Sequence, residues 1–210
     1  MKLTRAMAIV GSLSTVSALL LQYVLLVRLT WDGIGPALAT VQFFSYFTIL
    51  SNLLVAIVLG FAAFCASPGN NGFLASARVK AAVALYITVT GCIYLFVLSP
   101  LWAPQGLQWL ADVALHYLVP VIYLTWWMTG VRHGSLVWLD AFRWLAFPLA
   151  FLLWVLIRGA WLNVYPYPFI DVSVLGAGTV AVNSVGICVL FVVIGCLLIT
   201  IDRWLGRAQS

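Results

Sequence analysis

The sequence contains no glutamate, and only 7% of its 210 residues are charged. All five acidic residues are aspartates, against ten lysines and arginines. Soluble domains carry charge on about 25% of their residues, because their surfaces face water. The shortage of charge therefore excludes an ordinary soluble domain. It also argues against nucleic-acid binding, which needs a concentrated basic patch on a soluble fold.

Clusters of metal-binding or redox residues are missing as well. The cysteines stand alone inside apolar runs, without the CxxC spacing of redox and zinc sites: Cys65, Cys92, Cys188 and Cys196. We interpret them as small packing residues. Within the apolar runs, one histidine and one aspartate, His116 and Asp112, are too few ligands for a catalytic zinc ion. No metal or other cofactor is predicted.

Long apolar runs are what the sequence does contain. Hydrophobic residues make up 65% of it, and its mean hydropathy is +1.14. Six runs reach about 20 residues, enough for helices to cross a hydrocarbon layer of about 30 Å. They cover residues 6–28, 40–65, 79–99, 110–130, 143–163 and 173–201. Most joints between them, such as residues 67–72, are rich in Gly, Pro or Asn. We therefore predict an all-α polytopic membrane protein, a single domain over residues 1–210 that forms a bundle of six transmembrane helices.

Positive charges are distributed unevenly between the two ends of these runs. Most fall on the side that holds both termini: Lys2, Arg5, Arg78, Lys80, Arg132, Arg143, Arg203 and Arg207. Only Arg28 and Arg158 fall on the other side. Because loops rich in Lys and Arg stay in the cytoplasm, we expect cytoplasmic termini and residence in the plasma (inner) membrane. The net charge of +5 reflects this asymmetry.

His116 lies four residues after Asp112 within the fourth run. This spacing places both side chains on one helix face, where the carboxylate can orient the imidazole. An ionisable pair at membrane depth is costly, which makes it a candidate functional site. Thr48 should lie at nearly the same depth, because it follows the outer start of its run by about seven or eight residues and His116 by about six. The other histidine, His133, falls in a cytoplasmic joint.

Further polar residues fall in the same outer half of the bundle. They are Asn52, Arg158, Asn163, Tyr165, Tyr167 and Asp171. Their convergence predicts a polar cavity that opens toward the outer leaflet. Arg158, Tyr165 and Asp171 are the candidate substrate-binding residues, and Arg158 would hold a substrate carboxylate. The alternative for Arg158 is an ion pair with Asp171 at the membrane interface.

The residue types in this layer suit acyl transfer to water. A threonine hydroxyl is a weak nucleophile that needs a base within hydrogen-bond reach, and an oriented imidazole is such a base. Thr48 would attack, His116 would move the proton and Asp112 would orient the imidazole. Asn52 would donate its amide to the developing oxyanion. The ordinary alternatives are a threonine bonded to the carbonyl one turn back and an asparagine in an interhelical hydrogen bond.

Three segments carry a resemblance to a known family. They are Tyr46-Phe47-Thr48-Ile49-Leu50-Ser51-Asn52, His116 with Pro120, and Arg158-Gly159-Ala160 with Val164-Tyr165-Pro166-Tyr167-Pro168-Phe169-Ile170-Asp171. In this order they resemble the six-span androgen-induced-gene family, which includes the androgen-dependent TFPI-regulating protein. The likeness covers essentially the whole chain, and the second Tyr-Pro pair resembles the prokaryotic branch.

The resemblance implies a hydrolase that cleaves fatty acid esters of hydroxy fatty acids. Its implied catalytic residues are an intramembrane threonine nucleophile, at Thr48, and a histidine, at His116. The eukaryotic pattern has Asn in place of Asp112, so the role of Asp112 rests on helical spacing and not on the resemblance.

We therefore expect an intramembrane lipid-ester hydrolase whose partners are a fatty-acid-ester substrate and membrane lipids. The alternative is a transporter or channel for a small polar or anionic solute, with His116 and Asp112 as a proton relay. A structural or regulatory membrane protein is a third class. The polar residues that would extend a path through the inner half are Thr88, Thr90, Thr125 and Asn183. The oligomeric state is left open.

Overall fold

The computed structural model describes residues 2–65 and 72–209, and this part of the chain forms helices and no strand. Six helical segments in it are long and apolar enough to cross a membrane, one over each predicted run. They are Lys2–Thr30, Phe47–Cys65, Ala77–Leu101, Gly106–Gly130, Leu139–Leu162 and Val172–Ala208. Their length and composition fit an integral membrane protein. Most of the predicted turn at residues 67–72 lies outside the described residues.

Shorter helical pieces build these segments. The α-helices are α1 (Lys2–Thr30), α2 (Gly35–Phe43), α3 (Phe47–Gly60), α4 (Ala77–Ile93), α5 (Gly106–Val113), α6 (Val119–Gly130), α7 (Leu139–Arg143), α8 (Ala146–Leu162) and α9 (Val172–Gln209). Turns of π-helix follow α3, α4 and α5 as η1 (Phe61–Cys65), η3 (Tyr94–Leu98) and η5 (Ala114–Leu118). Short 3-10 turns are η2 (Phe73–Ala75), η4 (Ser99–Leu101) and η6 (Pro168–Ile170). Single π-helical turns inside longer helices are frequent at functional sites.

The second predicted run differs from the structure. We expected one continuous helix over residues 40–65, but the chain leaves the helix at residues 44–46, the last of which is extended with φ −100° and ψ 128°. Ser45 contributes to this break, because its hydroxyl donates to the Val41 carbonyl at 2.7 Å and competes with backbone hydrogen bonding. Thr48 therefore lies in the first turn of α3 and not two turns inside a longer helix.

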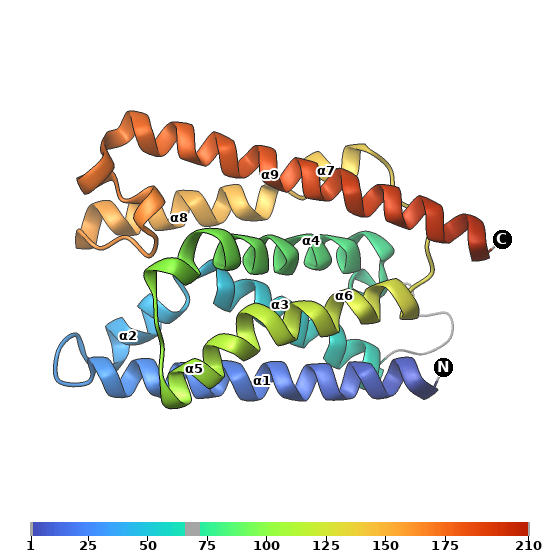
Figure 1. Ribbon diagram of the computed structural model, residues 1–210, viewed down its shortest axis with the longest axis horizontal. Coiled ribbons are helices and arrows are strands. Elements are labelled where there is room, and N and C mark those ends of the chain that lie inside the picture. Colours follow the sequence, from blue (N-terminus) through green and yellow to red (C-terminus); the bar gives the residue numbers. More distant parts are fainter. Residues whose placement is uncertain (1, 66–71, 210) are drawn as a thin grey trace.

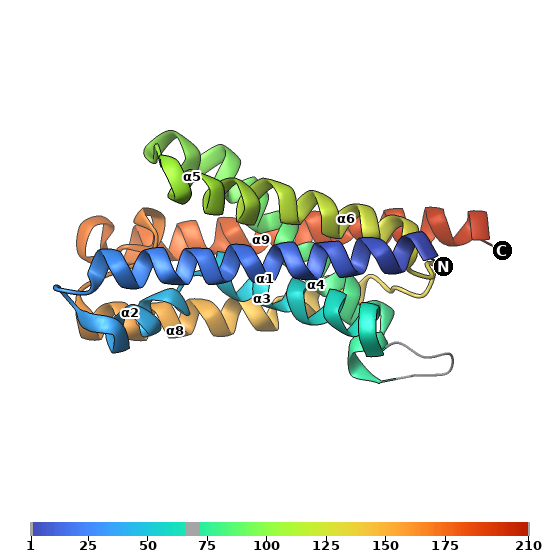
Figure 2. The same ribbon diagram turned by 90° about the horizontal axis from the view of Figure 1, so that it is seen from below.

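Figure 1 shows α4 in the middle of the bundle, where it contacts α3, α6 and α9. α1 packs against α3 and α6, on the side of the bundle away from α9. In the turned view of Figure 2, α1 runs along almost the whole length of the bundle. Both chain termini lie at the same end in both views, which we call the terminal end.

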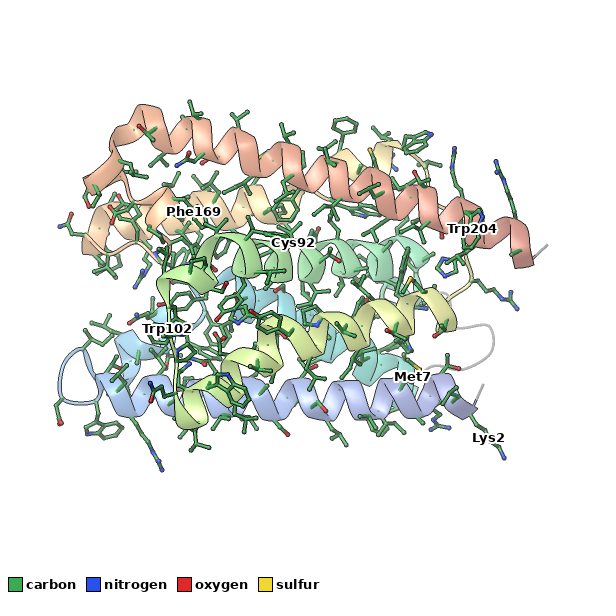
Figure 3. The ribbon with its side chains drawn as sticks, viewed as in Figure 1. Lys2, Met7, Cys92, Trp102, Phe169 and Trp204 are labelled. Atoms are coloured by element: carbon green, nitrogen blue, oxygen red, sulfur yellow. The ribbon has the colours of Figure 1, made fainter. Side chains whose placement is uncertain are left out.

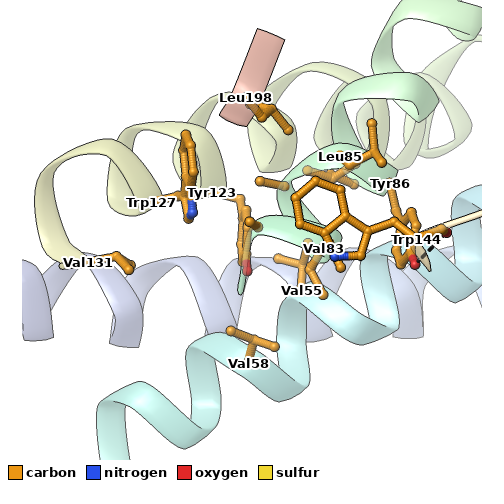
Figure 4. Close-up of a cluster of buried hydrophobic side chains, with 14 of the residues drawn as sticks. Val55, Val58, Val83, Leu85, Tyr86, Tyr123, Trp127, Val131, Trp144 and Leu198 are labelled. Carbon is orange, nitrogen blue, oxygen red and sulfur yellow. Dashed lines mark hydrogen bonds between the residues drawn. The ribbon is translucent and has the colours of Figure 1, made fainter. Parts of the chain in front are cut away.

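Large buried side chains fill the half of the bundle next to the terminal end (Figure 4). There, Tyr123 is 0% and Trp127 1% exposed, and they share one apolar cluster with Leu59 and Leu85. The Tyr123 hydroxyl donates to the Lys80 carbonyl at 3.0 Å, so its polar end is also satisfied. Dense packing of this kind resists deformation. This half of the bundle is therefore a scaffold for the opposite half.

The last turns of α9 are fastened to the segment that follows α6. Asp202, which is 1% exposed, accepts a hydrogen bond from the backbone N–H of Leu136 at 3.1 Å and lies 3.0 Å from His133 Nδ1. Beside this contact, a Cβ atom on Gly206 would lie 2.5 Å from the Gly134 Cα. Only glycine allows the two backbones to approach so closely.

Gly206→Ala should destabilise the protein, because the added methyl group must displace the backbone at Gly134. We expect a loss of about 1–3 kcal/mol in the free energy of unfolding, which is typical of overpacking. Gly186→Ala in the same helix is the matched control, since nothing lies within 4 Å of its Cβ position. Thermal unfolding in detergent measures both variants. Equal melting temperatures would contradict the close approach.

Candidate functional site

Thr48 and His116 are in hydrogen-bond contact. Thr48 Oγ1 lies 3.2 Å from His116 Nε2, although 68 positions separate the two residues in the sequence. The first turn of α3 carries the threonine, and the π-helical turn η5 carries the histidine. The structure therefore brings together the two side chains that were matched by depth, even though the helix that carries Thr48 begins later than expected.

Thr48 is placed differently from the other helical threonines. Several of these donate to the carbonyl four residues earlier, as membrane threonines commonly do: Thr15, Thr88, Thr90, Thr125, Thr129 and Thr200. The residue four positions before Thr48 is Phe44, which belongs to the break between α2 and α3. The Phe44 carbonyl is thus not in helical register with Thr48. The Thr48 hydroxyl faces His116 instead.

Asp112 holds the other ring nitrogen of His116. Nδ1 lies 3.0 Å from the Asp112 carbonyl oxygen and 3.2 Å from its carboxylate Oδ1. Both oxygens are acceptors, so we assign the proton to Nδ1 from its partners. In that tautomer, Nε2 presents its lone pair to the Thr48 hydroxyl. The arrangement matches the order of nucleophile, base and orienting group.

Tyr94 completes this group and was not among the predicted site residues. Its hydroxyl donates to Asp112 Oδ2, and its ring stacks on the His116 imidazole with the centroids 3.8 Å apart and 15° between the planes. Asp112 is only 6% exposed, and a buried carboxylate requires such partners on both oxygens. The depth comparison that paired Thr48 with His116 would have found Tyr94, since it lies near the same end of the third run.

A cavity of about 410 Å³ adjoins these side chains, in the half of the bundle away from the terminal end. Its wall includes Thr48, His116, Asp112, Tyr94, Gln22 and Gln108. The two glutamines join α1 to α5, because Gln108 donates to Gln22 at 2.8 Å. Figure 3 shows Trp102, another residue of this wall, far from Lys2 and Trp204 at the terminal end. We call this space the large cavity.

Asn52 does not have the arrangement expected of an oxyanion donor. Its amide nitrogen donates to the Thr48 carbonyl at 2.8 Å and to the Leu115 carbonyl at 3.2 Å, so both amide hydrogens are engaged. The bond to Leu115 joins α3 to η5, which is the interhelical role weighed as the alternative. Asn52 therefore supports the site by holding together the two segments that carry Thr48 and His116.

Arg158 and Asp171 do not form the ion pair that was one alternative. Within the described residues, Arg158 Nη1 donates to the Val164 carbonyl at 2.9 Å, and its buried Nε has no partner. Asp171 accepts from the Ser173 backbone N–H at 3.0 Å and so caps the start of α9. Neither side chain belongs to the wall of the large cavity. Their predicted contact with substrate has no support in this geometry.

Both Tyr165 and Tyr167 were expected beside the cavity, with Tyr165 as the candidate substrate-binding residue, but only Tyr167 lines it. The Tyr165 ring lies against Gly159, where a Cβ atom would be 2.1 Å from it, and it does not line the large cavity. Tyr167 does line the cavity, beside Thr48. The sequence contains two adjacent Tyr-Pro pairs, and the path of the loop determines which tyrosine ring lines the cavity.

The Tyr167 hydroxyl sits at the start of α3. It accepts the backbone N–H of Phe47 at 2.8 Å, one of the amides that have no acceptor within the helix. Burial raises the pKa of Tyr167 to about 12, while hydrogen bonding with Phe47 and Thr48 acts in the opposite direction. The phenol is therefore protonated at neutral pH and has a hydrogen to donate.

Within residues 2–65 and 72–209, no group of three or more His, Cys, Asp or Glu side chains is placed to hold a metal ion. In comparisons with known proteins, no family model, no curated protein and no solved structure matches the chain. The function is therefore inferred from the site itself.

Tyr167→Phe should lower stability by about 1–3 kcal/mol, because the Phe47 N–H would be left buried without its acceptor. Tyr165→Phe is the matched control two residues away, and we expect its effect to stay within about 0.5 kcal/mol. Thermal unfolding of both variants in the same detergent compares them. A Tyr167→Phe protein as stable as the control would show that the phenol does not cap α3.

Proposed function

We propose that this chain is an intramembrane lipid-ester hydrolase, with Thr48 as nucleophile and His116 as general base. The observation that carries the proposal is the 3.2 Å contact between Thr48 Oγ1 and His116 Nε2, with Nδ1 of the same ring held by Asp112. A base within this distance is the requirement for activating a hydroxyl. The large cavity beside the pair provides room for a substrate.

In the proposed reaction, Thr48 Oγ attacks the ester carbonyl carbon while His116 Nε2 takes the hydroxyl proton. The tetrahedral intermediate then collapses, the bond to the alcohol oxygen breaks, and His116 returns the proton to that oxygen. Water repeats the sequence on the acyl-threonine, with His116 as base, and releases the carboxylic acid and free Thr48. Asp112 keeps the imidazole in the required tautomer and stabilises the imidazolium that forms.

Negative charge on the carbonyl oxygen would develop at the start of α3. A helix N-terminus favours negative charge, because its amides have no helical acceptors and the helix dipole is positive there. Tyr167 adds a protonated phenol at the same place, beside Thr48 in the cavity wall. We therefore assign the oxyanion contact to Tyr167 in place of Asn52, whose amide hydrogens are engaged.

The position of the cavity in an apolar bundle favours an ester that carries hydrocarbon chains as the substrate class. The distribution of Lys and Arg supports a cytoplasmic terminal end, with the cavity on the outer side of the plasma (inner) membrane. The motifs around Thr48 and His116 support membership in the androgen-induced-gene family. That membership points to fatty acid esters of hydroxy fatty acids as candidate substrates.

The packing of the other half of the bundle argues against a transporter. A solute path would have to pass the cluster around Tyr123 and Trp127, whose side chains are at most 1% exposed. The polar residues considered for such a path donate to nearby backbone carbonyls: Thr88, Thr90, Thr125 and Asn183. A polar site confined to one end of the bundle suits catalysis better than conduction.

Thr48→Ala should abolish ester hydrolysis, with a loss of about 10³-fold or more in kcat, because the nucleophile is removed. His116→Ala should lose about 10²-fold to 10⁴-fold, the usual contribution of a general base. Release of octanoic acid from its ester with a long-chain alcohol in nanodiscs measures both, and labelling by a fluorophosphonate reports on the nucleophile separately. Thr125→Ala is the control, since this threonine is exposed and bonds only its own helix.

A Thr48→Ala protein that hydrolyses and labels like the wild type would overturn the nucleophile assignment. Loss of activity in the Thr125→Ala control as well would instead point to a general loss of folding.

Asp112→Asn should retain substantial activity. The backbone carbonyl of Asp112 also accepts from Nδ1 at 3.0 Å, so the tautomer is held even when the carboxylate is replaced. We expect a loss of about tenfold in kcat/KM, equivalent to about 1.4 kcal/mol, the scale of one hydrogen bond. Steady-state hydrolysis measures it. Complete loss of activity in a folded Asp112→Asn protein would mean that the negative charge itself is required.

A further inference from the structure

A second pocket, of about 80 Å³, lies behind Thr48 and is bounded by α3, α4, α8 and α9. We call it the acyl pocket. Its wall includes Phe47, Phe151, Phe169, Ile187, Cys188 and Phe191. Figure 3 shows Phe169 in the same half of the bundle as Trp102, a wall residue of the large cavity. Thr48 and Tyr167 belong to the walls of both spaces, so the proposed nucleophile stands between them.

The wall of the acyl pocket is mostly hydrocarbon and has few polar groups without a hydrogen-bond partner. Apart from those of Thr48 and Tyr167, its hydroxyl groups are already bonded within their own helices, since Thr90 donates to the Tyr86 carbonyl at 2.9 Å and Ser184 to the Val180 carbonyl at 2.7 Å. Aromatic rings and aliphatic side chains make up most of the remaining wall. A ligand part that enters this pocket must therefore be apolar.

His116 distinguishes the two spaces. It lines the large cavity and is not part of the acyl pocket wall, whereas Thr48 lines both. The alcohol oxygen that leaves in the first step must receive its proton from His116, so it must lie on the His116 side. The acyl chain stays attached to Thr48 and extends away from the leaving group. This geometry directs the alcohol part of an ester to the large cavity and the acyl part to the acyl pocket.

We propose that the substrate binds across Thr48, with its acyl chain in the acyl pocket and its alcohol part in the large cavity; this rests on the proposed hydrolase function. The sizes of about 80 Å³ and 410 Å³ then select a short or medium-length acyl chain and a larger alcohol part. The polar side chains Gln22, Gln108 and Tyr94 in the large cavity suit an alcohol part that carries polar groups. The enzyme discriminates against long acyl chains more strongly than against long alcohols.

Two ester series test this assignment. The first keeps ethanol as the alcohol and varies the acid from butanoic to octanoic to hexadecanoic acid. The second keeps octanoic acid and varies the alcohol from ethanol to octanol to hexadecanol. We expect kcat/KM to fall at least tenfold toward the longest acid in the first series and to change less in the second. The reverse pattern would overturn the proposed orientation of the ester.

A substitution at Cys188, in the wall of the acyl pocket, tests whether this pocket determines the preferred length of the acyl chain. Cys188→Phe fills part of the pocket and should move the optimum of the acid series to shorter chains, while the alcohol series keeps its order. Cys196→Phe is the matched control, two turns further along α9 and outside both walls. An unchanged acid profile in an active Cys188→Phe protein would overturn the assignment but leave the hydrolase intact. That result is also expected if a bilayer lipid tail fills the pocket.

Alkylation of Cys188 measures binding in the acyl pocket without requiring catalysis. In a Thr48→Ala background whose other cysteines, Cys65, Cys92 and Cys196, are replaced by alanine, ethyl octanoate should slow the reaction of Cys188 with N-ethylmaleimide several-fold. No slowing would contradict binding of an acyl chain there. If the wild type hydrolyses no ester yet Cys188 is protected, the hydrolase proposal fails and the hydrocarbon-binding pocket stands.

Discussion

The buried carboxylate of Asp112 is the constraint on which the site depends. In a bundle surrounded by lipid, a carboxylate without partners would be far more costly than any single packing contact. Asp112 is satisfied by two rings from different segments, Tyr94 in η3 and His116 in η5. Those rings in turn stack on each other at 3.8 Å. The requirement to satisfy one charge therefore fixes the orientation of the imidazole that faces Thr48.

The backbone is shaped to allow this arrangement. Tyr94 and His116 both lie in π-helical turns, which rotate the following residues relative to a regular α-helix. Pro120 follows at the start of α6 and has no N–H to donate to the His116 carbonyl. That carbonyl lies 3.3 Å from where a Cβ of Gly91 would be, so glycine permits α4 to approach it. The close approach of α4 and η5 is what places the tyrosine ring on the histidine.

The length of the apolar runs and the depth of residues within them could predict part of this structure, and side-chain direction explains most of what they missed. Six apolar runs located the six membrane-length helices, because hydrocarbon thickness fixes helix length. Depth also paired Thr48 with His116. Depth alone does not say in which direction an amide or a ring points. Asn52 was therefore expected to contact the oxyanion, although its amide binds two backbone carbonyls. Tyr165 was expected to contact substrate, although Tyr167 is the tyrosine in the cavity wall. Arg158 fell at the correct end of the bundle but outside the cavity wall.

The break between α2 and α3 turns an ordinary membrane threonine into an available hydroxyl. In a continuous helix over residues 40–65, Thr48 would have had the Phe44 carbonyl one turn back, the acceptor type that Thr88 and Thr125 use. Its hydroxyl proton would then point into the helix and away from any base. Because α3 begins at Phe47, Thr48 instead stands where the helix dipole favours negative charge and where Tyr167 supplies a phenol. The break at residues 44–46, which makes the prediction of one long helix wrong, thus leaves the Thr48 hydroxyl free of an acceptor in its own helix and facing His116.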